Sequence, residues 1–190
     1  MLTERPIERF ASAQGFAAWL EAHHDERLGV WIMFAKKGSH ERTPSYEEIL
    51  EVALCFGWID SQVRRLDETF YLQAFTPRRS RSPWSKRNRE KAEAFIAAGL
   101  MRPSGLAEVE RARADGRWAR AYDGPASAEA PEDFLAALAA DPAAQAFYET
   151  LDAQNRYAVY FRLQDAVRPE TRARRIEQFV AKLARGERFH

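Results

Sequence analysis

The chain has 190 residues, with 29 lysines and arginines against 28 aspartates and glutamates, which gives a formal net charge of +1. This length is sufficient for one substantial domain or two small ones, each with a core of its own. The nearly balanced charge gives no argument for nucleic-acid binding, and no stretch approaches the roughly 20 apolar residues that a membrane-spanning helix needs.

The N-terminal sequence MLTERPIERFASAQGF lacks a basic segment followed by an apolar run, which is the pattern of a secretory signal. Cys55 is the single cysteine, so an internal disulfide is excluded and a reducing compartment is indicated. We therefore expect a cytoplasmic protein without a membrane partner. The histidines have no metal-ligand spacing, so we predict no metal, and no cofactor is predicted either. The four are His23, His24, His40 and His190.

The first predicted elements belong to an α+β unit. Ser12 is a suitable N-cap for a first helix. Residues 28–36, LGVWIMFAK, are apolar on both faces and predict a central strand. Ser45 and Glu48 have the spacing of a capping box and predict a second helix, which ends at Gly57. A small antiparallel sheet of at least three strands, packed with helices, is therefore expected.

A β-hairpin is predicted next, because the strings WIDSQVRRL and TFYLQAFT flank residues 67–68, a suitable two-residue turn. With that turn, Asp60 lies opposite Phe75 and Arg64 lies opposite Tyr71. Alternation then gives one core-like face and one face that mixes aromatic and charged groups. The core-like face is Ile59, Ser61, Val63, Leu72 and Ala74, and the mixed face is Trp58, Asp60, Gln62, Arg64, Tyr71, Gln73 and Phe75.

A basic segment follows the hairpin. The string PRRSRSPWS is too rich in proline and arginine for regular structure, and Ser85 is then the N-cap of a helix that stops at Gly99. From Thr76 to Lys91 there are seven cations and one anion, a formal charge of +6. A helix start that presents free N–H groups and several arginines is suited to bind phosphate or carboxylate.

We therefore predict a cleft between the mixed face of the hairpin and the start of this helix, which binds a small anionic or phosphate-bearing ligand. The structural alternative is that arginines near Asp60 form an ion-pair network and that the tryptophans pack in the core. The predicted ligand-binding residues are Trp58, Asp60, Gln62, Arg64, Arg78, Trp84, Ser85, Arg87 and Asn88.

Two other functions stay open. Residues 78–89 are basic enough to contact a nucleic acid, with Tyr71 and Phe75 as stacking groups. Alternatively, the protein is an enzyme in which Asp60 is a general base and arginines stabilise charge. The sequence supplies no second acid–base partner, so no catalytic residue is assigned.

The C-terminal part is predicted to be wholly helical. Residues 123–130, DGPASAEA, have the composition of a linker and separate an α+β domain, 1–122, from a helical subdomain, 131–190. Four amphipathic helices are expected in this subdomain. Their starts are marked by Pro131, Asp141, Asp152 and Pro169.

Five strings carry a resemblance to a known family. They are ALCFGWIDSQVRRLD (53–67), FTPRRSRSPWSKRN (75–88), AAGLM (97–101), DGRWARAY (115–122) and ETRARRIE (170–177). Together they resemble the bacterial YdeI/OmpD-associated family, also described as bacteriocin-protection proteins, over about residues 29–188. The resemblance implies protection against antimicrobial peptides or association with an outer-membrane protein. It carries over no catalytic residue.

Overall fold

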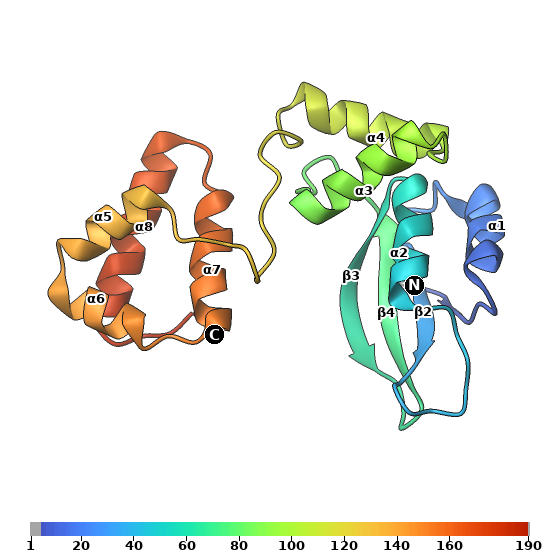
Figure 1. Cartoon of the computed structure of the whole chain (residues 1–190), viewed down its shortest axis with the longest axis horizontal. Helices are drawn as coiled ribbons and strands as arrows, with labels where there is room; N and C mark the ends of the chain where they lie inside the picture. Colours follow the sequence, from blue (N-terminus) through green and yellow to red (C-terminus); the bar gives the residue numbers. More distant parts are fainter. Residues whose placement is uncertain (1–4, 190) are drawn as a thin grey trace. The chain divides into compact units, whose positions relative to one another are not determined.

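The computed structural model describes residues 5–189, which form two compact units divided between Ala121 and Tyr122 (Figure 1). The first unit contains a sheet and four helices, and the second contains helices, so the predicted α+β class is confirmed. The helices of the first unit are α1 (Ala13–His23), α2 (Tyr46–Cys55), α3 (Lys86–Ala97) and α4 (Pro103–Ala114).

The sheet of the first unit has four strands, β1 (Ile7–Glu8), β2 (Val30–Ala35), β3 (Trp58–Arg65) and β4 (Phe70–Pro77), in the order β1-β2-β4-β3. Strand β4 is antiparallel to both β2 and β3, as the sequence predicted, whereas β1 is parallel to β2. Strand β1 has two residues, and so short a segment has no alternation from which it could be predicted.

The hairpin of β3 and β4 has the predicted pairing at its base and a different pairing toward its tip. Asp60 lies opposite Phe75, as predicted. A bulge after Asp60 then shifts the register, so that Arg64 lies opposite Leu72 instead of Tyr71. Directly opposed residues share a face of the sheet, so Arg64 lies on the face opposite to Asp60.

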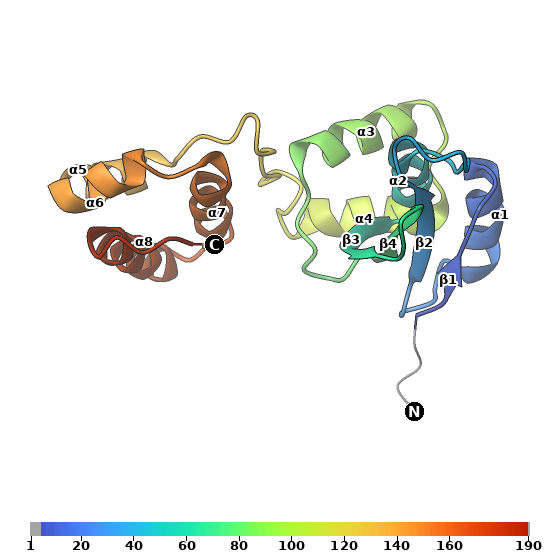
Figure 2. The same cartoon turned by 90° about the horizontal axis from the view of Figure 1, so that it is seen from below.

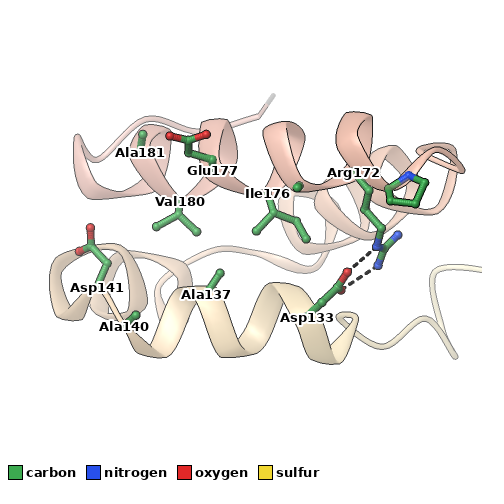
Figure 3. A pocket seen from close by; sticks show the side chains of 11 residues that line it. Asp133, Ala137, Ala140, Asp141, Arg172, Ile176, Glu177, Val180 and Ala181 are labelled. Atoms are coloured by element: carbon green, nitrogen blue, oxygen red, sulfur yellow. Dashed lines mark hydrogen bonds and ion pairs between the residues drawn. The ribbon is translucent and has the colours of Figure 1, made fainter.

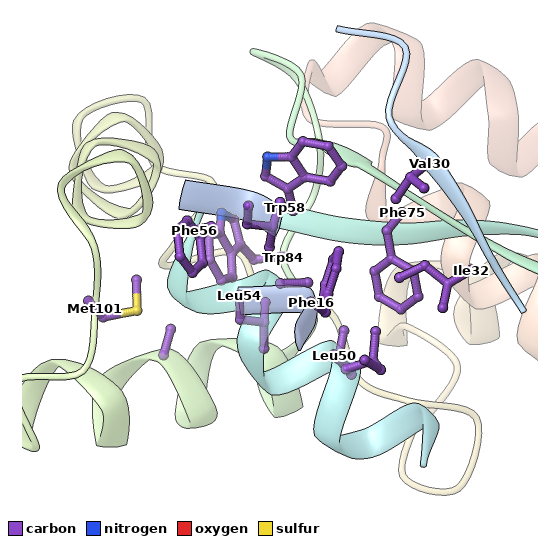
Figure 4. Packing of buried hydrophobic residues seen from close by; sticks show 14 of the residues in the cluster. Phe16, Val30, Ile32, Leu50, Leu54, Phe56, Trp58, Phe75, Trp84 and Met101 are labelled. Carbon is purple, nitrogen blue, oxygen red and sulfur yellow. The ribbon is translucent and has the colours of Figure 1, made fainter. Parts of the chain in front are cut away.

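Helices α1 and α2 lie against one face of the sheet (Figures 1 and 2). Phe16 of α1 and Leu50 of α2 pack there near Ile32 and Phe75 (Figure 4), with the rings of Phe16 and Phe75 6.0 Å apart. This is the face that carries Trp58, which the sequence analysis assigned to ligand binding. Leu72 and Ala74 of the predicted core-like face are buried, but Trp58 and Phe75 are buried as well, so the mixed face is not an open binding face at the base of the hairpin.

The second unit consists of four helices around a separate core (Figure 1). Phe134, Leu138, Val159, Leu163 and Leu183 are buried in that core. Between the described residues 5 and 189, no helix is long and apolar enough to cross a membrane. The helices of this unit are α5 (Glu132–Ala139), α6 (Pro142–Glu149), α7 (Ala153–Gln164) and α8 (Pro169–Ala184).

Candidate functional site

Two of the predicted ligand-binding residues are core tryptophans. Trp58 is 0% exposed and Trp84 is 1% exposed. The indole N–H of Trp58 donates to the backbone oxygen of His24 at 2.7 Å, so its polar atom is already used within the protein. Trp58 is therefore a packing residue that joins β3 to the end of α1.

Asp60 and Arg87 belong to polar contacts that join β3, α2 and α3. The half-buried Asp60 carboxylate is hydrogen-bonded to Tyr46, the first residue of α2, and burial together with this carboxylate raises the pKa of the Tyr46 hydroxyl. Arg87 forms an ion pair with Glu47, which also binds the Lys91 ammonium at 2.6 Å. The hydrogen bond from Lys91 is the main reason why the pKa of Glu47 lies below its ordinary value. The described contact of Asp60 is thus with a tyrosine, whereas the structural alternative placed Asp60 in an ion-pair network with arginines.

The remaining predicted residues have separate positions. Gln62 lies within the bulge and Arg64 lies beyond it, and both side chains are exposed. Ser85 is the N-cap of α3, and its hydroxyl accepts from the backbone N–H of Asn88, whose side chain is buried. None of the nine predicted residues lines the cavities of about 750, 520 and 510 Å³ found among the described residues.

A different group of residues does come together around Trp84. We call it the arginine–tryptophan cluster, and it consists of Arg78, Trp84, Arg89, Arg117 and Trp118. The guanidinium carbon of Arg78 lies 3.5 Å from the centroid of the Trp84 ring, and the Trp84 and Trp118 rings meet edge to face at 4.8 Å. Two of the nine predicted residues, Arg78 and Trp84, thus form one stacked pair in the interior.

Arg117 and Arg89 connect this cluster to three chain segments. Arg117 Nη1 donates to the backbone oxygen of Ser82 at 2.8 Å, and its Nε binds the Asp115 carboxylate at 2.8 Å. Arg89 Nη1 donates to the backbone oxygen of Trp118 at 3.4 Å. The side chains of Arg117 and Arg89 are only 11% and 26% exposed. This cluster therefore joins the loop of residues 78–85 to helix α3 and to the segment after α4.

Three donors of the cluster have no hydrogen-bond acceptor among the described residues, although the Glu93 carboxylate lies 3.9 Å from Nε of Arg89. They are the indole Nε1 of Trp84, Nε of Arg89 and Nη2 of Arg117, and all three atoms are buried. Most buried N–H groups in folded proteins are hydrogen-bonded, and a missing partner costs about 1–3 kcal/mol. Arg117 pairs with Asp115 and Arg89 lies near Glu93, so each guanidinium already has a carboxylate beside it. The three unused donor atoms are what the oxygens of an oxyanion would satisfy.

The sequence analysis missed Arg89, Arg117 and Trp118 as site residues. Arg89 was counted within the basic segment but was not assigned to the cleft. Arg117 is 35 residues from the Ser82 oxygen that it binds, and no local pattern reports a contact of that separation. The string RWARAY was the only sign, because it places two arginines beside a tryptophan.

Neither a metal site nor a reactive thiol is apparent in the described part of the chain. No group of three or more His, Cys, Asp and Glu side chains there is arranged to hold a metal ion. The half-buried Cys55 lines the cavity of about 520 Å³, and burial raises the pKa of its thiol to about 11. A thiol with this pKa is protonated near neutral pH and is a weak nucleophile.

Comparison with known families gives two matches. Residues 8–108 match a family described as a domain of unknown function, DUF8412, and residues 127–186 match a family described as bacteriocin-protection, YdeI or OmpD-associated. The second match confirms the resemblance for residues 127–186. The strings at 53–67 and 75–88 lie instead in the region that matches the first family. No curated protein and no solved structure gave a significant match.

Proposed function

We propose a ligand-binding function for this chain, which belongs to the DUF8412 family by its residues 8–108 and to the bacteriocin-protection, YdeI/OmpD-associated family by residues 127–186. The proposed ligand is a small anion or a phosphate-bearing molecule, and the proposed site is the arginine–tryptophan cluster. Of the residues predicted from the sequence, Arg78 and Trp84 belong to this cluster.

The three buried donors without acceptors carry the proposal. A single oxyanion group presents several acceptor lone pairs in a small volume and would satisfy donors that neutral protein groups leave unused. Hydrogen bonds from arginine to an oxyanion are charge-assisted and are roughly twice as strong as neutral ones. The indole N–H of Trp84 adds a donor of fixed direction, because its ring is held between Arg78 and Trp118.

The burial of the cluster favours a small ligand over a nucleic acid. Proteins that bind single-stranded nucleic acids use exposed aromatic groups on which bases stack. Phe75, one of the two stacking groups of that alternative, is 0% exposed and lies in the core. Arg79 and Arg81 are exposed and could contact a nucleic acid, so this alternative is tested below. For the enzyme alternative, the contact described for Asp60 is its hydrogen bond with Tyr46.

Thermal unfolding of the full chain in phosphate and in pyrophosphate, against chloride at equal ionic strength, tests the proposal. We expect a saturable rise in Tm, since a ligand at about 100 times its Kd stabilises the folded state by about 2.7 kcal/mol. Arg117→Gln removes one of the donors and should abolish the rise. Arg120→Gln removes an exposed cation of the same segment and should preserve it.

Trp84→Phe is a second test variant, which is needed because Arg117→Gln could lose the rise in Tm by unfolding. It removes the indole N–H and keeps an apolar ring, so we expect weaker phosphate binding by about tenfold with a cooperative transition retained. Equal stabilisation of the wild type and of Arg117→Gln by phosphate would contradict the proposal. A steep loss of single-stranded DNA binding with salt would favour the nucleic-acid alternative instead.

We also propose that the protein works in the cytoplasm. Support comes from the single cysteine, Cys55, which suits a reducing compartment. Fractionation of cells that express the natural chain should place it with soluble cytoplasmic markers. Recovery of the chain with periplasmic markers would contradict this placement.

A further inference from the structure

The second unit contains an apolar groove between α5 and α8, with a volume of about 750 Å³ (Figure 3). Four alanines line it, and Ile176 and Val180 of α8 project into it. Alanines on both walls leave room for the backbone of another segment to approach closely. The alanines are Ala137, Ala140, Ala173 and Ala181.

The two ends of the groove differ in charge. At one end, Arg172 forms two hydrogen bonds with the Asp133 carboxylate, at 2.5 and 2.8 Å, so this end is neutralised (Figure 3). At the other end lie the carboxylates of Asp141 and Glu177 (Figure 3). Within residues 5–189, neither of these two carboxylates has a cationic partner within 4.0 Å. The groove is therefore apolar along its length and anionic at one end.

Helix α8 carries four basic side chains, and within residues 5–189 none of them forms an ion pair with Asp141 or Glu177. Arg174, three residues before Glu177, is exposed and lies more than 4.0 Å from that carboxylate. Arg172 is used by Asp133, Arg175 lies 3.8 Å from Asp165, and the Lys182 ammonium lies over the Phe189 ring at 5.1 Å. Asp141 is the N-cap of α6, where its carboxylate accepts from the backbone N–H groups of Ala143 and Ala144.

From this arrangement we infer that the groove is the docking site of a cationic amphipathic helix from another polypeptide. Its apolar side chains, at i, i+3, i+4 and i+7 spacing, cover the alanine walls, and a lysine or arginine at one end pairs with Glu177 and Asp141. Helix α5, which forms one wall, has eight residues and is about 12 Å long, so two turns of the partner fill the groove.

Binding of a labelled leucine–lysine peptide of about four helical turns to the full chain, measured by fluorescence anisotropy, tests this inference. Glu177 is exposed, so Glu177→Lys should leave the fold intact and weaken binding about tenfold. Ala173→Phe fills the groove and should weaken binding at least as much. Glu149→Lys makes the same charge change at an exposed site outside the groove and should leave Kd within about twofold.

Four results would overturn the inference. The first is failure of the wild-type chain to bind the peptide, and the second is binding of the peptide by Ala173→Phe that is as tight as binding by the wild type. The third is a loss of binding in Glu149→Lys as large as that in Glu177→Lys, which would show general charge attraction. The fourth is a concentration-dependent dimer in sedimentation that Ala173→Phe abolishes, because a second copy of the chain would then occupy the groove.

Discussion

Single residues reproduce their predicted roles where the interaction is local. Ser12, Ser45, Ser85 and Asp152 each cap a helix, with the side-chain oxygen accepting from a backbone N–H three residues later. Such caps depend on neighbours in the sequence and can be read from it. The unpartnered donor of Arg117 could not be predicted, because its surroundings come from residues about 30 positions away.

Cys55 gives a residue-scale prediction. Burial raises the pKa of its thiol to about 11 from an ordinary value near 9.0, so at pH 8 the folded protein has about 100-fold less thiolate than the unfolded chain. We expect an aromatic disulfide reagent to react with the folded protein about 100-fold more slowly than with the same protein in urea. Equal rates in the two states would contradict the burial of this thiol.

The same shift has a consequence for stability. Above about pH 9 the unfolded state loses the thiol proton while the folded state retains it, so unfolding releases a proton. The free energy of unfolding should therefore fall as the pH rises from about 9 to 11. Cys55→Ala should show a smaller fall over this range, and an identical pH dependence of both proteins would argue against the raised pKa.

At the scale of elements, the hairpin shows which structural features the alternation of apolar and polar residues can predict. Alternation predicted two strands and the pairing of Asp60 with Phe75, but the bulge after Asp60 placed Arg64 on the other face. The connection is also longer than the predicted two-residue turn, because residues 66–69 lie outside the strands. The Asp67 carboxylate accepts there from the backbone N–H of Thr69. A bulge has no distinct residue pattern in this sequence, so the faces beyond it could not be assigned.

The contact of α4 with α2 depends on a glycine. A Cβ atom added to Gly105 of α4 would lie 2.2 Å from the backbone oxygen of Cys55, far inside van der Waals contact. The same oxygen accepts from the backbone N–H of Arg102 at 2.9 Å, so it cannot move away without losing a hydrogen bond. Close approach of the helices therefore excludes a side chain at this position.

We expect Gly105→Ala to lower the free energy of unfolding by about 2 kcal/mol or more, although alanine ordinarily favours a helix by about 1 kcal/mol over glycine. Urea denaturation followed by circular dichroism measures the change. Gly124→Ala is the control, since no atom lies within 4 Å of its added Cβ, and it should change stability by less than about 0.5 kcal/mol. A neutral or stabilising Gly105→Ala would show that the helices are not held this closely.

At the scale of the whole molecule, the chain separates its two proposed binding surfaces. The arginine–tryptophan cluster lies entirely in the first unit and the apolar groove entirely in the second, and each unit has its own hydrophobic core. The α+β class and the helical C-terminal part could be predicted, because they follow from periodic apolar patterns. The clustering of Arg89 with Arg117 and Trp118 could not, because it depends on packing between α3 and the segment that follows α4.

The most direct measurement is a crystal structure of the full chain with tungstate, an oxyanion shaped like phosphate whose metal is located by anomalous scattering. We expect a tungsten peak at the arginine–tryptophan cluster, with its oxygens accepting from Trp84 Nε1 and Arg117 Nη2. Ordered water at these donors, with no tungsten at the cluster when tungstate is in excess over the protein, would contradict anion binding there.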